Sequence, residues 1–313
     1  MRVRKAITFE RLLARLLVVA PDRWMLKGAL ALDFRLGIHA RVTMDMGLGR
    51  YDDTDAATVD LLAADFRLGI HARVTMDMDL GRYDDTDAAT VDLLAAQERD
   101  LGDYFVFGVE RTDRLDALRE ATAVRYHVHA ELAGRTFEHV TVDVGFSPPP
   151  TGGQPWPMDT IVGPDLLAFA GITPIRIPTL SLEYHIAEKL HAYTRGYGET
   201  GTIQSTRVKD LIDLVVIAST TALSAHRLHS ALMEVFEGRR SQALPPHLPP
   251  PPTAWHRPYA TMAQGVGLET DLAAGYARTA AFLDPILSSE VPMVAVWNET
   301  QQRWQAPDNT PLG

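Results

Sequence analysis

The sequence contains no cysteine, so the chain can form neither a disulfide framework nor a thiolate metal site. This composition fits the reducing cytoplasm, where we expect the protein to act. The sequence also lacks any stretch approaching the roughly 20 uninterrupted apolar residues of a membrane span. Even the apolar stretch near the N-terminus is interrupted by Arg11 and Arg15. We therefore expect no membrane partner.

Positive charge is scarce as well. The chain has 30 Lys and Arg residues against 40 Asp and Glu residues, a formal net charge of −10. Such a surplus on average repels nucleic acid, so binding to RNA would require a local basic patch. With 313 residues, of which 46% are hydrophobic and 22% charged, the chain has a globular composition and is long enough for one large domain or two smaller ones.

One segment occurs twice in direct succession. The sequence at 33–64 is repeated at 65–96, and the copies differ only where the first has Gly47 and the second has Asp79. Solenoid families repeat at similar periods, but their units diverge and at least three are needed to share a core. We therefore interpret the pair as a recent tandem duplication in which only the second copy keeps this carboxylate.

The front half of the chain has the pattern of an α+β fold. Apolar residues on one face predict a first helix with Thr8 as its N-cap, and a second helix is expected to end at Gly37. Alternating β-branched, apolar and acidic residues predict a strand in each copy, at 40–46 and 72–78, each followed by a helix. Further strands are expected from Tyr104 and from Phe137.

A stretch rich in proline and glycine, beginning at Ser147, predicts a domain boundary. We therefore expect one domain at 1–150, which contains both copies of the duplicated segment, and a second at 151–313. The second is expected to be mainly helical, with helices at 182–193, 208–220, 224–236 and 268–283. The proline run at 244–252 is expected to form a stiff, extended connector.

Two carboxylates two positions apart are the main chemical feature of the second copy. Because residues i and i+2 of a strand point to the same face, Asp77 and Asp79 would lie side by side. Hard divalent cations, Mg²⁺ above all, neutralise such a pair, and two bound ions suit in-line phosphoryl transfer. Asp143, in a later strand, could complete this metal site. The alternative is a solvated edge strand whose acids face outward.

Lys27 and Gly28 stand at the expected start of the second helix. Backbone N–H groups at a helix N-terminus attract phosphate, and glycine allows a ligand to approach closely. This dipeptide therefore indicates a phosphate-binding site, although an ordinary turn would have the same sequence.

A third cluster of polar residues lies on two predicted helices of the back half. Lys189 shares a helix face with His185 and Tyr193, while Asp210 and Asp213 lie one turn apart on the next helix, with Arg207 one turn before them. Ion pairs on the surface of amphipathic helices would explain the same pattern. The histidines, including His191, lack the HExxH spacing of a zinc site, and we interpret them as polar-face residues.

Together these features resemble the AbiEii/MenT family of nucleotidyltransferase toxins. The resemblance rests on Lys27–Gly28, the R-x-T-x-D-x-D pattern, a later strand aspartate, "EKLHA" at 188–192 and "RVKDLIDL" at 207–214. It implies a DNA polymerase β-like core with a mixed sheet and flanking helices, joined to a mainly helical domain. It also implies transfer of a nucleotide from an NTP, with Mg²⁺, to an acceptor, tRNA in characterised members, and a cognate antitoxin as partner.

The resemblance also implies roles for individual residues. Catalysis is expected from Asp77, Asp79, Lys189 and Asp213. Nucleotide binding is expected from Lys27, Gly28, Lys189 and Arg207, and metal binding from Asp77, Asp79 and Asp143. One departure is Ala29, which stands where the family motif usually has a second glycine, and which removes backbone freedom next to the expected phosphates.

The duplication is the other departure, because it offers two registers for the catalytic strand. Counted from Lys27, the family spacing leads to the first copy, where Asp45 stands alone because Gly47 replaces the second acid. Asp45 would then be the metal ligand and the enzyme would be severely impaired. We favour the second copy, because Gly47 weakens a strand interior and suits an inserted segment better. A catalytically impaired binding protein and a small-molecule nucleotidyltransferase remain the alternative functions.

Overall fold

The computed structural model describes residues 3–37, 77–82, 86–114, 122–146, 156–195 and 207–306. The chain divides into two compact units, one of Met1–Pro148 with Met158–Leu180, and one of Pro149–Pro157 with Ser181–Gly313. The first is an α+β unit with a mixed sheet and the second is mainly helical, which confirms the predicted fold class. The units differ from the predicted domains because Met158–Leu180 returns to the first sheet.

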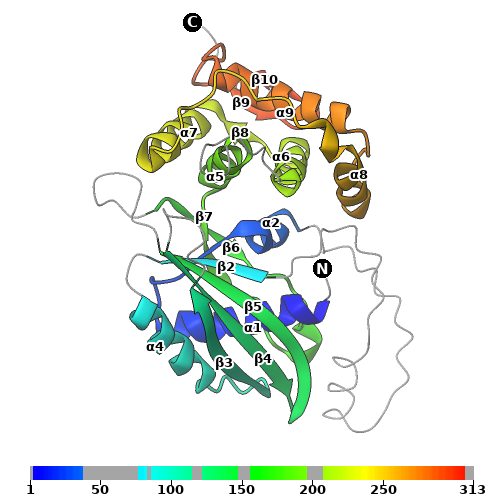
Figure 1. The fold of residues 1–313 in the computed structure, drawn as a ribbon. Coiled ribbons are helices and arrows are strands. Elements are labelled where there is room, and N and C mark those ends of the chain that lie inside the picture. Colours follow the sequence, from blue (N-terminus) through cyan, green and yellow to red (C-terminus); the bar gives the residue numbers. More distant parts are fainter. Residues whose placement is uncertain are drawn as a thin grey trace, which may run out of the picture. The chain divides into compact units, whose positions relative to one another are not determined.

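A seven-stranded sheet organises the first unit, in the order β3-β4-β5-β2-β1-β7-β6 (Figure 1). Its strands in chain order are β1 (Met25–Lys27), β2 (Asp77–Arg82), β3 (Phe105–Arg114), β4 (Thr122–Leu132), β5 (Arg135–Phe146), β6 (Met158–Val162) and β7 (Arg176–Leu180). The pairs β2 with β5 and β1 with β7 are parallel, and the other pairs are antiparallel. The centre of the sheet therefore holds the second copy's strand.

Three α-helices of the described residues pack on this sheet, namely α1 (Val3–Val19), α2 (Gly28–Leu36) and α4 (Thr86–Gln97). Figure 1 shows α1 crossing behind the long strands β4 and β5, with α4 next to it, and α2 beside β2. Alternation along the central strands sends their apolar side chains into the buried core, which includes Met78, Leu80, Val142 and Val144. The acidic residues between them therefore face away from that core.

The predicted N-cap of the first helix is wrong. Helix α1 begins at Val3, and the Thr8 hydroxyl, inside the helix, donates a hydrogen bond to the carbonyl oxygen of Arg4 at 2.9 Å. A threonine hydroxyl that bonds to the preceding turn no longer marks a helix start. Arg15, which interrupts the apolar face, is fully buried and donates to both carboxylate oxygens of Asp103, at 2.9 and 2.6 Å.

The two copies of the duplicated segment contribute different elements. The first supplies the last residues of α2, whereas β2 and α4 belong to the second. The strand predicted at 72–78 is described from Asp77 and continues to Arg82, because its pairing with β5 extends to Phe146. The first copy from residue 38, with the predicted strand at 40–46, lies outside the described residues.

Among the described residues, the second unit contains five α-helices, of which four lie near predicted positions and the fifth, α8, was not predicted. Its elements are α5 (Leu182–Thr194), α6 (Val208–Thr220), β8 (Leu223–Ser224), α7 (Ala225–Arg239), α8 (His256–Gly265), α9 (Leu272–Leu287), β9 (Val296–Asn298) and β10 (Arg303–Gln305). The segment 244–252 contains no helix or strand, as predicted. None of the described helices has both the length and the apolar character needed to cross a bilayer.

Candidate active site

Four charged side chains form one row across the sheet of the first unit. The register places Lys27 of β1 opposite Asp79 of β2, Asp79 opposite Asp143 of β5, and Asp143 opposite Arg125 of β4. Residues in register on neighbouring strands lie on the same face. The row therefore has two acids in the middle and one cation at each end, and Asp77 faces the same side two residues before Asp79.

Arg125 supplies positive charge to these acids. Its Nε and one terminal nitrogen donate to the two oxygens of Asp143, each at 2.7 Å. The pKa of Arg125 is raised, first by this hydrogen bond and then, against the opposing effect of burial, by the charges of Asp143, Asp77 and Asp79. The sequence analysis did not identify Arg125, although its alternation with His127 placed it on the polar face of a strand.

The predicted metal ligands Asp79 and Asp143 lie in register on adjacent strands, and Asp77 lies two residues before Asp79. Among the described residues, no group of three or more Asp, Glu or His side chains is arranged to hold a metal ion. The reason at Asp143 is plain, because both of its oxygens are turned to Arg125. Carboxylates are the right donors for a hard divalent ion, so the residues fit Mg²⁺ in type, provided that Asp143 exchanges one partner for another.

Gly28 begins α2 at the point where the carboxylate of Asp79 comes closest. Its φ is +70°, and a β-carbon there would lie 1.9 Å from Oδ2 of Asp79. Both the left-handed backbone and the close approach require glycine. The Lys27–Gly28 dipeptide thus marks a helix start, as predicted, and α2 begins without a side-chain cap from Lys27. The N–H groups of its first turn suit an anion.

The side chain of Lys27 crosses two glycines in the neighbouring strands. Its Nζ lies 3.0 Å from the place that a β-carbon of Gly145 would occupy, and its Cδ and Cε lie 3.8 and 3.9 Å from that of Gly81. Because Gly81 of β2 and Gly145 of β5 have no side chains, the ammonium group of Lys27 can lie over the sheet, next to the acidic row.

The second unit contains the lysine and aspartate of the later motifs. Nζ of Lys189 on α5 lies 2.6 Å from Oδ2 of Asp213 and 3.5 Å from Oδ1 of Asp210 on α6. Nε of Arg207 donates to the other oxygen of Asp210 at 2.7 Å. Lys189, Asp210 and Asp213 are 7%, 3% and 7% exposed. Surface ion pairs are therefore the wrong interpretation of this cluster.

The histidines of α5 are not polar-face residues. His185 and His191 are 2% and 1% exposed, because α5 packs against both α7 and α6. The Nε2 atom of His191 lies 2.7 Å from the hydroxyl of Ser241. Burial lowers the pKa of His191 from 6.5 to about 4, and the charges of Arg239 and Arg195 act in the same direction.

The lowered pKa of His191 predicts that the free energy of unfolding falls in acid. A histidine that is neutral in the folded protein contributes its full stability above about pH 6.5, and that contribution declines as the pH falls toward 4. We expect the loss to be on the order of 2–3 kcal/mol, measurable as a fall in melting temperature. His191→Gln should flatten this dependence, whereas the same change at the exposed His256 should not. An equally steep profile for His191→Gln would contradict the prediction.

Comparison with known proteins identifies a family model and similar solved structures. Residues 62–284 match the family model described as nucleotidyl transferase AbiEii toxin, type IV toxin–antitoxin system. This range includes the whole second copy and the Lys189 cluster, and Lys27 and Gly28 precede it. A search of curated proteins finds no match. Among solved structures, the chain is similar to MenT4, a nucleotidyltransferase toxin from Mycobacterium tuberculosis H37Rv, at 16% identity and a TM-score of 0.49, covering 95% of this chain and 85% of that one.

Proposed function

Since the chain belongs to the family of AbiEii nucleotidyl transferase toxins of type IV toxin–antitoxin systems, we propose that it transfers a nucleotide from an NTP to the 3′ acceptor end of tRNA, with Mg²⁺. The observation that carries the proposal is the charged row on the sheet, in which Asp79 and Asp143 lie in register between Lys27 and Arg125. The family implies an NTP substrate and an antitoxin partner.

The NTP phosphates are assigned to the start of α2. The first-turn N–H groups attract negative charge, and Lys27 adds a compact ammonium beside them. Gly28 keeps this helix start against Asp79, so that phosphate-binding groups and acids are neighbours. Ala29, in place of a second glycine, restricts the backbone here but leaves the N–H groups in position.

The acids Asp77, Asp79 and Asp143 are assigned to metal binding. A divalent ion, when bound, offsets the negative charge of the phosphates and of the pyrophosphate that leaves. Asp79 and Asp143 come from parallel strands in register, so both carboxylates rise from the same stretch of sheet. Asp143 first has to release Arg125, whose guanidinium then lies free beside the reacting groups.

The reaction is a single displacement at phosphorus. The acceptor oxygen forms a bond to the α-phosphorus of the NTP, and the bond from that phosphorus to the oxygen bridging to the β-phosphate breaks. Pyrophosphate leaves with the electron pair of that bond, and the hydroxyl proton passes to solvent. By the family resemblance, Lys189 offsets the charge of the leaving pyrophosphate, Arg207 assists in binding the nucleotide, and Asp213 holds Lys189.

Incubation with each labelled NTP, Mg²⁺ and total tRNA tests the proposal. We expect label from at least one NTP to enter tRNA, to remain after phenol extraction and to be lost when the 3′ nucleotides are trimmed. Release of pyrophosphate without label in RNA would indicate a small-molecule acceptor, and absence of both products would indicate a catalytically impaired protein. Either result would overturn the assignment to tRNA.

Arg125→Gln is expected to tighten metal binding. The substitution frees both oxygens of Asp143 and removes one positive charge from beside three acids, so a divalent ion meets no resident competitor. Mn²⁺ titration followed by electron paramagnetic resonance should show a dissociation constant lower by about tenfold, or about 1.4 kcal/mol. Arg111→Gln, which removes a cation paired with Asp87 at 3.6 Å, is the matched control. Equal Mn²⁺ affinity in wild type and Arg125→Gln would exclude this competition.

A further inference from the structure

We infer that a strip of three histidines on β4 and β5, next to the acidic row, binds the unpaired 3′ nucleotides of the acceptor RNA. The strip consists of His127, His129 and His139, all exposed. This inference rests on the proposed function, because it places the acceptor strand relative to the acids of the same sheet.

The three imidazoles share one face of the sheet. His129 lies opposite His139 across the β4–β5 pair, and their ring centroids are 6.4 Å apart. The ring of His129 also lies against the backbone of β3, since a β-carbon on Gly108 would lie 1.8 Å from its Cε1. Because Gly108 has no side chain, the ring of His129 can lie over β3 at this position.

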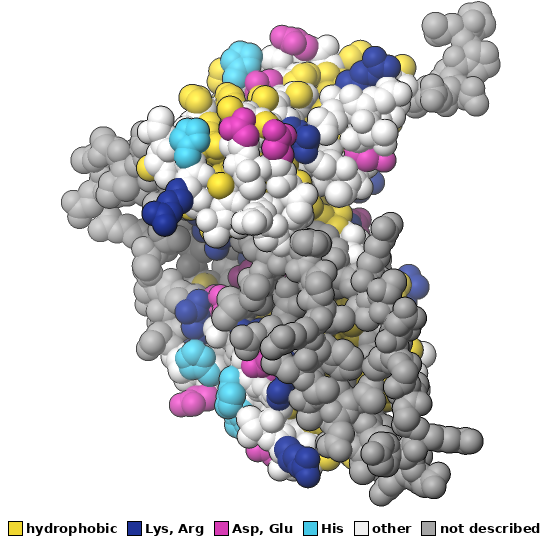
Figure 2. Space-filling view, turned by 90° about the vertical axis from the view of Figure 1, so that its right-hand side faces the viewer, with side chains coloured by type: hydrophobic (Ala, Val, Ile, Leu, Met, Phe, Trp, Pro, Cys, Tyr) yellow, Lys and Arg dark blue, Asp and Glu magenta, His cyan; other side chains and the backbone are white. Residues whose placement is uncertain are grey.

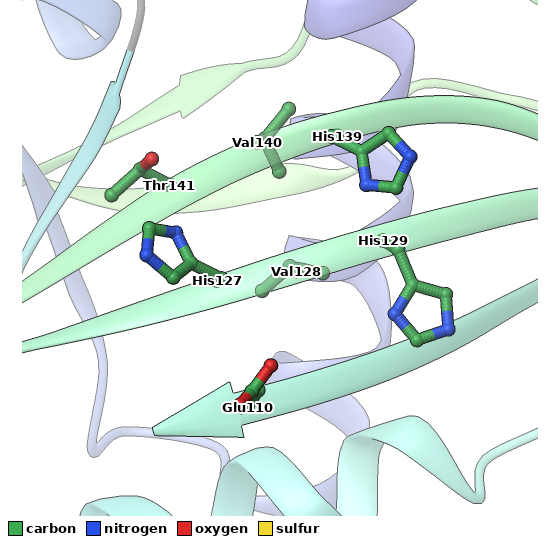
Figure 3. Close-up of a pocket in the computed structure, with 7 residues that line it drawn as sticks. All are labelled: Glu110, His127, Val128, His129, His139, Val140 and Thr141. Atoms are coloured by element: carbon green, nitrogen blue, oxygen red, sulfur yellow. The ribbon is translucent and has the colours of Figure 1, made fainter. Parts of the chain in front are cut away.

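These histidines line a hollow on the surface of the first unit. It has a volume of about 330 Å³ and is lined by residues of β3, β4 and β5, which are drawn in Figure 3 (Glu110, His127, Val128, His129, His139, Val140 and Thr141). Glu110 lies opposite His127 in the β3–β4 register. The hollow therefore presents three imidazoles, with the carboxylate of Glu110 beside them.

The strip is continuous with the acidic row. Along β4, His127 and His129 follow Arg125 at steps of two residues, and along β5 Thr141 and His139 precede Asp143 in the same way. Each step of two residues advances about 6.7 Å, so His129 lies about 13 Å along β4 from Arg125. A few unpaired nucleotides cover this distance, which lets a 3′ hydroxyl reach the acids while the preceding bases lie on the imidazoles.

The chemistry of the strip favours unpaired RNA. Bases of single-stranded RNA stack on histidine rings, and imidazole N–H groups can donate to phosphate or base oxygens. On the face that Figure 2 draws, the visible Lys and Arg side chains are dispersed among acidic and uncharged side chains. Because the chain carries a net charge of −10, stacking of bases on the imidazoles, which needs no positive surface, suits an acceptor strand here.

The test is a binding experiment that does not require turnover. The variant His127→Ala/His129→Ala/His139→Ala is titrated with fluorescent tRNA and with the same tRNA trimmed of its unpaired 3′ nucleotides. We expect the variant to bind intact tRNA at least about tenfold more weakly than wild type, because about one stacked base or more is lost. Trimmed tRNA should bind both proteins equally. Tyrosine at the same three positions should restore most of the affinity.

Matched controls separate this inference from the proposed function. The exposed histidines of the second unit give the control variant His226→Ala/His247→Ala/His256→Ala, which should bind tRNA as wild type does. Mn²⁺ affinity should not change in the β4–β5 variant, which also reports that its sheet is intact. Equal tRNA affinity in wild type and variant overturns the inference, as does a loss of antitoxin neutralisation with RNA binding unchanged. Failure of wild type to bind any tRNA overturns the proposed acceptor instead.

Discussion

Asp79→Asn is expected to lower the rate of nucleotide transfer by about a hundredfold to a thousandfold, the scale of losing one preorganised electrostatic group. Asp79 stands in the centre of the row, in register with Lys27 on one side and Asp143 on the other. The amide keeps the shape of the side chain beside Gly28 but cannot supply the charge that a divalent ion needs. The rate is measured as labelled nucleotide incorporated per enzyme, at saturating NTP.

Two variants sharpen this experiment. Asp87→Asn changes a carboxylate of the same copy that is 91% exposed, and it should leave the rate unchanged. Gly47→Asp, introduced together with Asp79→Asn, completes the acid pair of the first copy. It should not rescue transfer, because the sheet takes its strand from the second copy. Rescue by Gly47→Asp would show that the copies can exchange places.

Lys189→Met is expected to impair both stability and transfer. The lysine is buried between two carboxylates. Its removal therefore deprives the buried carboxylate of Asp213 of one cation. Breaking a buried ion pair from one side commonly costs about 3 kcal/mol or more. The free energy of unfolding from urea titration measures this loss, and transfer should fall at least about a hundredfold. Lys209→Ala, at an exposed position of α6, is the control.

The double variant Lys189→Met/Asp213→Leu separates structure from chemistry. Replacing both members of a buried ion pair by apolar residues is often neutral for stability, and Asp210 keeps its hydrogen bond from Arg207. We therefore expect the free energy of unfolding to recover while transfer stays low. If transfer recovered with stability, Lys189 would have only a structural role.

The acidic pair and its strand could be predicted from the sequence, because alternation in a strand depends on nearest neighbours alone. The partner of Asp143 could not. Near the turn, Leu132 pairs with Arg135, and extending that register would place Val124 opposite Asp143. The irregularity between Ala130 and Glu131 shifts the pairing by one residue, which brings Arg125 there instead. A bulge of this kind moves every later side chain to a new partner, and nothing in the local sequence announces it.

Burial of polar residues was the other limit of the sequence analysis. The spacing of Asp210 and Asp213 placed them one turn apart on one helix, but it did not indicate that both contact Lys189 of the preceding helix. Helix periodicity places residues on a face but does not say what covers that face, so buried His191 looked the same as an exposed histidine. The covering helix α7 follows some 30 residues later, and its packing against α5 is a tertiary contact that the local sequence does not indicate.

The two copies contribute different elements to the fold, and this has a genetic consequence. Helix α2 ends in the first copy and β2 lies in the second, yet 33–36 and 65–68 have the same sequence. Removing one repeat in frame therefore leaves a chain that can still build both elements. The position of the junction decides which residue survives. A junction upstream of position 47 retains Asp79, and one downstream retains Gly47. The gene therefore encodes two versions of this segment one after the other. A single recombination event between the copies determines which version remains.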